Sequence, residues 1–123
     1  MTNAILSGKR VLVVEDEMMI AMLLEDMLID LGCEVVGIAS RLDDALLCAQ
    51  NTAFDIAILD VNLNGQTSYA VADALVERGL PFVFATGYGS GGLTPRYQHI
   101  TTLQKPFQIS DLIRALSDAL AAG

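Results

Sequence analysis

Short apolar runs alternate along this chain with longer segments in which apolar residues recur every three or four positions. The first pattern is typical of strands buried in a parallel sheet, and the second of helices that pack one face on such a sheet. The predicted strands are residues 10–14, 34–39, 54–59, 81–85 and 100–103. The predicted helices are residues 18–31, a segment between Ser40 and Asn51, 67–78, a short piece within 93–99, and about 109–121. Strands separated by helices pair in parallel through right-handed crossovers, so the pattern predicts an α/β fold, a doubly wound five-stranded parallel sheet with helices on both faces.

Residues at the ends of the predicted helices indicate where each helix begins and ends. Gly32 and Gly79 follow helical segments, and glycine is typical just after the end of a helix. Asp16 and Ser40 precede helical segments, and Asp43 lies three residues after Ser40 as in a capping box. We therefore expect Asp16 and Ser40 to cap the first two helices.

Other stretches are defined by composition. The segment 18–31 is apolar almost all round, so we expect much of this helix to be buried. Residues 1–9 are expected to be a short leader, and 62–65 a loop. Residues 87–92 contain four glycines, which predicts a compliant loop.

Polar residues stand where the predicted strands end. The carboxyl ends of parallel strands meet at one edge of a sheet, where open α/β proteins bind their ligands. The residues that should converge at this edge are Glu15, Asp16, Asp60, Thr86 and Lys105.

This set of residue types favours phosphoryl chemistry. Three carboxylates in one pocket repel each other and favour a cation, and hard oxygen ligands suit Mg²⁺. A carboxylate is also a competent nucleophile for a phosphoryl group, whose oxygens a metal ion, an ammonium and a hydroxyl could contact. A Ser-His-Asp site is not expected, because the single histidine, His99, lies in a predicted loop, and no glycine-rich nucleotide phosphate loop occurs.

Composition narrows the class further. A chain of 123 residues that is 53% hydrophobic suits one domain with one core. Its net charge of -8 argues against nucleic-acid binding, which needs clustered Lys and Arg. The two cysteines, Cys33 and Cys48, are expected to be reduced and packed, and no zinc motif occurs. With no apolar signal-peptide core and no membrane-spanning run, we expect a cytoplasmic protein.

The order of these motifs resembles the receiver domain of two-component response regulators. An acidic pair after strand one, Asp60 after strand three, Thr86 after strand four and Lys105-Pro106 after strand five each match at a strand end. The resemblance covers roughly residues 8–121 and implies a single receiver domain over 1–123. It also implies the flavodoxin-like strand order 2-1-3-4-5.

The resemblance implies a role for each site residue. Asp60 would accept a phosphoryl group from a phosphohistidine on a sensor kinase or phosphotransfer protein. Asp16 would bind Mg²⁺ directly, Glu15 directly or through water, and Asn62 through its backbone carbonyl.

The remaining roles concern the fourth and fifth strand ends. Thr86 and Lys105 would contact phosphoryl oxygens, and the bond between Lys105 and Pro106 is commonly cis in the family. Gly87 would leave the pocket mouth open, and Tyr88 occupies a position that tunes dephosphorylation.

Two features set this chain apart from most receivers. Family members usually carry Tyr or Phe three residues before the lysine, where this chain has Thr102, so we expect the region 87–99 to carry the change between states instead. Residues 81–88 (Pro-Phe-Val-Phe-Ala-Thr-Gly-Tyr) resemble the signature of the alphaproteobacterial receivers nicknamed FATGUY, which often act alone with kinases of the HWE or HisKA2 type.

The leading interpretation is a single-domain response regulator, not an enzyme, that acts through a protein partner or drains phosphate from a kinase. A receiver excised from a longer regulator is the main alternative. A small Mg²⁺-dependent phosphatase of the haloacid dehalogenase type is disfavoured, because it needs Asp-x-Asp where this chain has Glu15-Asp16-Glu17.

Overall fold

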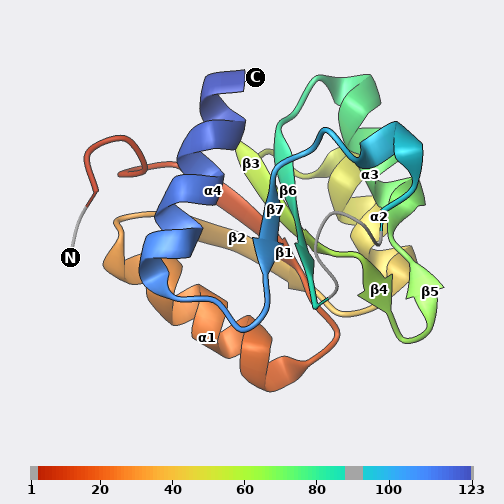
Figure 1. Cartoon of the computed structure of the whole chain (residues 1–123), viewed down its shortest axis with the longest axis horizontal. Helices are drawn as coiled ribbons and strands as arrows, with labels where there is room; N and C mark the ends of the chain where they lie inside the picture. The colour runs from red at the N-terminus through yellow and green to blue at the C-terminus, as the bar shows by residue number, and fades with distance from the viewer. Residues whose placement is uncertain (1–2, 88–92, 123) are drawn as a thin grey trace.

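The structure, a computed structural model, describes residues 3–87 and 93–122 and has a five-stranded parallel sheet at its centre. The strands run in the order β2-β1-β3-β6-β7 (Figure 1). Their bounds are β1 Arg10–Val14, β2 Glu34–Ala39, β3 Ile56–Asp60, β6 Phe82–Thr86 and β7 Thr102–Gln104. In chain order of the sheet strands this is 2-1-3-4-5, so the predicted fold and topology are confirmed.

Helices cover both faces of the sheet. Figure 1 shows α1 (Met18–Asp30) and α4 (Ile109–Ala122) on one side, and α2 (Leu42–Asn51) and α3 (Tyr69–Arg78) on the other. Alternate residues of β1 divide between the two cores: Val11 and Val13 pack with α1 and α4, whereas Leu12 and Val14 pack with α2 and α3. This division follows from the two-residue period of a strand, whose successive side chains point to opposite faces of the sheet.

β1 and β2 have their predicted limits, whereas the other three sheet strands differ from theirs by one or two residues. β3 begins at Ile56 and includes Asp60 as its last residue, and Phe54 is buried just ahead of the strand. β6 likewise includes Thr86, and β7 begins at Thr102 instead of residue 100.

The predicted loop 62–65 is part of a small antiparallel hairpin. β4 (Asn62–Leu63) pairs with β5 (Gln66–Thr67), and Asn64 and Gly65 form the turn with φ angles of 52° and 84°. Both residues have positive φ, as a tight two-residue hairpin turn requires, and Asn-Gly is a favoured pair for it. The loop prediction was therefore wrong, and α3 begins at Tyr69 instead of residue 67.

The fourth crossover holds only a short helix in its described part, as predicted. This is the 3₁₀ turn η2 (Pro95–Tyr97), with proline in its first turn. Tyr88 and most of the glycine-rich stretch 87–92 lie outside the described residues.

The predicted glycine caps are confirmed and the predicted polar caps are wrong. Gly32 and Gly79 adopt φ angles of 91° and 69° after α1 and α3. In the described chain, the N-cap residues of α1 and α2 are Glu17 and Arg41, and neither makes a side-chain cap hydrogen bond. The carboxylate of Asp16 instead accepts a hydrogen bond from the hairpin, as described below.

The prediction that α1 is largely buried was wrong. Its buried residues are Ala21, Leu24 and Leu28, which form one stripe. Five large apolar side chains of the helix are exposed: Met18, Met19, Met22, Leu23 and Ile29. Apolar residues around a helix do not say which of them a neighbour covers, and here only one stripe meets the sheet.

The segment before β1 belongs to the core and is not a free leader. Leu6 is fully buried in the cluster between the sheet, α1 and α4. The backbone N–H of Asn3 donates to the carbonyl of Leu31, and that of Gly8 to the carbonyl of Gly32. The N-terminal segment thereby closes the end of α1.

The described part of the chain bears on two further predictions, one about the cysteines and one about membrane-spanning segments. Cys33 and Cys48 are free thiols, the first buried and the second half-buried. Within residues 3–87 and 93–122, no helix is both long and apolar enough to cross a membrane.

Candidate functional site

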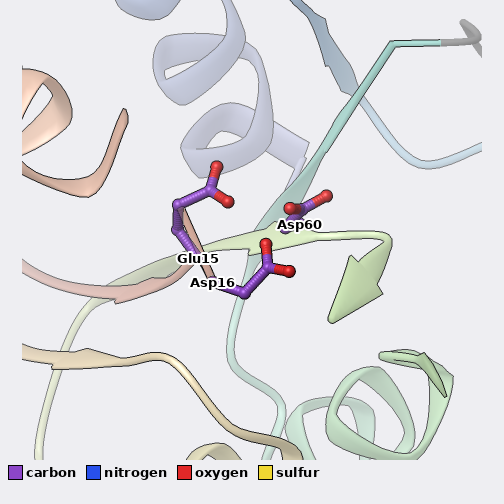
Figure 2. Close-up of side chains that lie close together, drawn as sticks. All are labelled: Glu15, Asp16 and Asp60. Carbon is purple, nitrogen blue, oxygen red and sulfur yellow. The ribbon is translucent and has the colours of Figure 1, made fainter. Parts of the chain in front are cut away.

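The predicted site residues converge at the carboxyl edge of the sheet. Glu15 and Asp16 directly follow β1, and Asp60 ends the neighbouring strand β3. Figure 2 shows the three carboxylates close together at this edge. One oxygen from each lies within 4.8 Å of the others, a spacing at which they could hold one metal ion. Glu15 and Asp60 are buried at 1% and 8% exposure, so their charges need a nearby cation.

Lys105 supplies a positive charge to this cluster. Its ammonium Nζ lies 2.7 Å from Oε1 of Glu15 and 3.2 Å from Oδ2 of Asp60. The lysine follows β7 and so reaches across β6 to the end of β3. Its peptide bond to Pro106 is cis, as the resemblance predicted.

The surroundings of the cluster shift the pKa values of Asp60 and Lys105. Burial, together with the hydrogen bond and charge of Glu15, raises the pKa of Asp60 to about 7, against the opposing effect of Lys105. Burial acts against the ammonium of Lys105, but the hydrogen bond to Glu15 and the charge of Asp60 raise its pKa. With its pKa raised in this way, Asp60 binds a proton more readily than an ordinary exposed aspartate.

The β4–β5 hairpin orients the other members of the cluster. The backbone N–H of Asn64 donates to Oδ2 of Asp16 at 3.0 Å, and the side chain of Asn64 donates to the carbonyl of Ser40. Burial acts to raise the pKa of Asp16, but this hydrogen bond helps to lower that pKa below the usual value. Sequence reasoning missed Asn64; the Asn64-Gly65 pair was the available signal for a tight turn.

Asn62 also belongs to the site. Its backbone N–H donates to Oδ1 of Asp60 at 3.3 Å, and its side-chain oxygen accepts from the N–H of Gly65. These bonds fix the chain that leaves β3 directly beside Asp60. Any ion held by the carboxylates would lie next to this stretch of backbone.

A pocket of about 420 Å³ opens over the cluster. A methyl group added at Gly87, which lies at this pocket, would meet no described atom within 4 Å, so this position leaves open space. The lining residues are Asp16, Glu17, Asp60, Asn62, Gly87 and Lys105.

Thr86 reaches the same edge beside the pocket. It is 5% exposed, and its carbonyl accepts a hydrogen bond from the backbone N–H of Lys105 at 2.9 Å. In the sheet, Asp60 pairs with Ala85, the residue before Thr86. The structure therefore brings together the predicted site residues that it describes: Glu15, Asp16, Asp60, Asn62, Thr86 and Lys105. Tyr88 lies outside the described residues.

The family model described as "Response regulator receiver domain" matches residues 11–117. The chain belongs to this family. It is therefore a signalling domain of the two-component type and not a member of a classical enzyme family.

Individual relatives agree with this assignment. The receiver is 33% identical over 117 residues to the transcriptional regulatory protein PdtaR of Mycobacterium tuberculosis, covering 92% of this chain and 57% of PdtaR. It thus spans little more than half the length of that relative.

Solved structures also match. The solution structure of SdrG from Sphingomonas melonis Fr1 is 42% identical, with a TM-score of 0.83 over 92% of this chain and 97% of that one. The structure described as the BeF3-activated conformation of SdrG from Pseudomonas melonis Fr1 is 40% identical, with a TM-score of 0.78 over 93% and 98%.

Proposed function

We propose that this receiver accepts a phosphoryl group on Asp60 from a phosphohistidine, in a reaction that needs Mg²⁺. The observation that carries the proposal is the position of Asp60: a carboxylate at the end of β3, beside two further carboxylates and 3.2 Å from the ammonium of Lys105. In the transfer, an Asp60 oxygen forms a bond to phosphorus while the bond from phosphorus to the histidine nitrogen breaks. The histidine then leaves neutral, with its electron pair on that nitrogen.

The residues at the site suit Mg²⁺. Glu15, Asp16 and Asp60 offer hard carboxylate oxygens within reach of one ion, and the backbone carbonyl of Asn62 would add a further oxygen. Such an ion would neutralise charge on the carboxylates and on the phosphoryl oxygens. Glu15 would bind it directly or through water.

The other residues of the site orient and stabilise the phosphoryl group. Lys105 would exchange its contact with the Asp60 carboxylate for one with a phosphoryl oxygen, and the Thr86 hydroxyl would bind another. The open space at Gly87 admits the donor. The receiver would catalyse its own phosphorylation and dephosphorylation only, with Tyr88 tuning the second reaction.

The donor would be a sensor histidine kinase, of the HWE or HisKA2 type, or a histidine phosphotransfer protein. The signature over residues 81–88 supports placing the chain in the FATGUY subgroup. With such a donor the protein would work in the cytoplasm, and neither nucleic acid nor a membrane would be among its partners.

The exposed apolar side chains of α1 support a protein donor that docks beside the pocket. Met18, Met19, Met22 and Leu23, here called the α1 face, are 48% to 84% exposed. α1 begins directly after Glu17, which lines the pocket. A partner that brings a histidine to Asp60 would therefore also cover this face, and flexible methionine side chains adapt well to such contacts.

Residues 8–121 would form the functional unit, a single receiver domain over 1–123. As a single-domain regulator it would pass the signal to a separate protein or drain phosphate from its kinase. As part of a longer regulator it would act on an attached domain, and the length of PdtaR is consistent with that alternative.

The test is phosphotransfer from purified candidate kinases of the host carrying labelled phosphohistidine. Wild-type receiver should take up the label in the presence of Mg²⁺ and should lose this ability when Mg²⁺ is chelated. The Asp60→Ala variant should remain unlabelled. Labelling of Asp60→Ala, or labelling that is indifferent to chelation, would overturn the proposal.

A further inference from the structure

The chain segment between Thr86 and Lys105 joins two of the residues that the proposed function places on the phosphoryl group. In the described part of this crossover, residues 93–101, Tyr97 makes several of the contacts that hold the segment in place. The backbone N–H of Tyr97 donates to the carbonyl of Thr94, and the carbonyl of Tyr97 accepts from the N–H of Ile100. Displacement of Tyr97 would therefore move the chain on both of its sides.

The ring of Tyr97 is buried among aromatic side chains. It is 4% exposed, stacks on Tyr69 of α3 with centroids 5.6 Å apart, and meets the edge of Phe84 in β6 at 5.5 Å. Phe84 lies two residues before Thr86 and pairs with Thr102 of β7. The aromatic ring against this part of the sheet thus comes from the crossover, in a chain whose β7 carries Thr102 where most receivers have an aromatic residue.

Polar contacts tie the same segment to α3. The hydroxyl of Tyr97 donates to Oδ1 of Asp73, and the guanidinium of Arg96 lies 2.9 Å from the same oxygen. The backbone N–H of Thr94 donates to the hydroxyl of Tyr69 at 3.1 Å. Tyr69 and Asp73 are four residues apart and therefore lie on one face of α3.

We propose that the Tyr97–Asp73 contact is a latch that holds the crossover in its unphosphorylated position and so opposes phosphorylation of Asp60. This inference rests on the proposed function. Drawing Thr86 and Lys105 onto a phosphoryl group pulls both ends of the crossover toward the pocket, since the N–H of Lys105 is bonded to the carbonyl of Thr86. The latch resists that movement by tying the crossover to α3. Tyr97 therefore acts as a positioning residue.

Linkage gives the direction of the effect. A contact present only in the unphosphorylated arrangement stabilises it, so weakening the contact favours the other arrangement and whatever binds to it. The hydroxyl contact to a carboxylate is charge-assisted, and its loss should shift the equilibrium by roughly tenfold.

The experiment measures the affinity of Mg²⁺-loaded receiver for beryllofluoride, a mimic of the phosphoryl group, from the amide NMR signals of β6 and β7. Tyr97→Phe and Asp73→Ala should each tighten binding by about tenfold. Both variants remove the Tyr97–Asp73 contact, and the ion pair with Arg96 that Asp73→Ala also removes is exposed and contributes little. The double variant should therefore tighten binding little further. Arg41→Gln, which removes an exposed ion pair with Asp43 on α2, is the control and should bind like wild type.

Thermal unfolding of each variant separates a latch from an ordinary stabilising contact. If Tyr97→Phe and Asp73→Ala lower stability but leave beryllofluoride affinity unchanged or weaker, the latch is refuted. Tyr69→Phe, which removes only the acceptor for Thr94, should tighten binding by a smaller factor and serves if the other variants fail to fold. Failure of the proposed function is distinct: wild-type receiver would then not bind beryllofluoride, or Asp60→Ala would bind it equally well.

Discussion

The ammonium of Lys105 lies 2.7 Å from a carboxylate oxygen of Glu15, although the two residues are 90 positions apart in the chain. Glu15 is 1% exposed, so this contact gives a buried charge its partner. The same ammonium reaches Asp60, which makes Lys105 a built-in cation for the carboxylate cluster. It therefore occupies, in part, the electrostatic role that a bound Mg²⁺ would fill.

Replacing Lys105 should show its two roles separately: partner of the buried Glu15, and competitor of Mg²⁺ for the carboxylate cluster. Lys105→Ala leaves Glu15 buried without its partner, so the free energy of unfolding of the metal-free protein should fall by about 3 kcal/mol. Mg²⁺ should bind more tightly than to wild type, because a competing cation is gone, while phosphotransfer should be lost. Urea unfolding and Mg²⁺ titration measure the first two effects. Weaker Mg²⁺ binding by this variant would contradict the account.

Asp60 should make the metal-free protein less stable as the pH rises. Its pKa in the folded protein is raised to about 7, above the ordinary value of an aspartate. Its stabilising contribution is therefore fully present below the unfolded-state pKa and is lost as pH rises through about 7. Asp60→Asn removes this titration, so its advantage over wild type in unfolding free energy should grow by about 2 kcal/mol between pH 5 and pH 8. Chemical unfolding at both pH values, without Mg²⁺, checks this difference, and a constant difference would disprove it.

Mg²⁺ should bind more strongly at higher pH. The ion needs Asp60 deprotonated, and the raised pKa of Asp60 means that a proton competes below about pH 7. Affinity should increase severalfold from pH 6 to pH 8. Thermal unfolding at a fixed excess of Mg²⁺ should show the larger stabilisation at pH 8. Asp60→Asn should lose most of this pH dependence.

The hairpin turn should matter for Asp16 and for metal binding. Gly65 has a φ of 84°, so Gly65→Ala strains the turn by about 1 kcal/mol and disturbs the neighbouring Asn64 N–H that holds Asp16. Mg²⁺ affinity should fall a few fold. The control is Gly37→Ala in β2, where a Cβ would make only an ordinary contact with Leu12 at 3.5 Å. Equal Mg²⁺ affinity in the two variants would show that the turn does not orient Asp16.

The sequence predicts the centre of this site better than its surroundings. Asp60 and Lys105 could be placed together because parallel strands end at one edge, a rule that needs only the strand limits. The bond from Asn64 to Asp16 depends on the register of a two-residue hairpin, and the contact of Tyr97 with Asp73 depends on how a crossover without a long helix settles on α3. The Asn64-Gly65 pair signals the turn itself, but no local pattern shows which residue either contact reaches.

The burial of α1 likewise could not be predicted from its hydrophobic residues alone. Its composition is apolar almost all round, which predicted a buried helix. The structure buries the stripe of Ala21, Leu24 and Leu28 and leaves Met19 84% exposed. The apolar residues of α1 therefore serve two purposes: some form the core and others form an exposed surface. Which residue does which depends on how the helix packs in the fold.

That surface gives the last prediction. Met19→Lys places a charge on the α1 face, where the wild-type side chain makes little contact with the core, so the unfolding free energy should change by no more than about 0.5 kcal/mol. If the face meets the phosphohistidine donor, the rate of phosphotransfer at limiting donor should fall by about tenfold, because a charge would be buried in an apolar contact. Beryllofluoride binding should be unaffected, since the pocket is intact. The matched control is Leu47→Lys on α2, an apolar residue 59% exposed on the other side of the sheet, which should transfer like wild type. Equal loss in both variants would mean that the α1 face has no special part in docking.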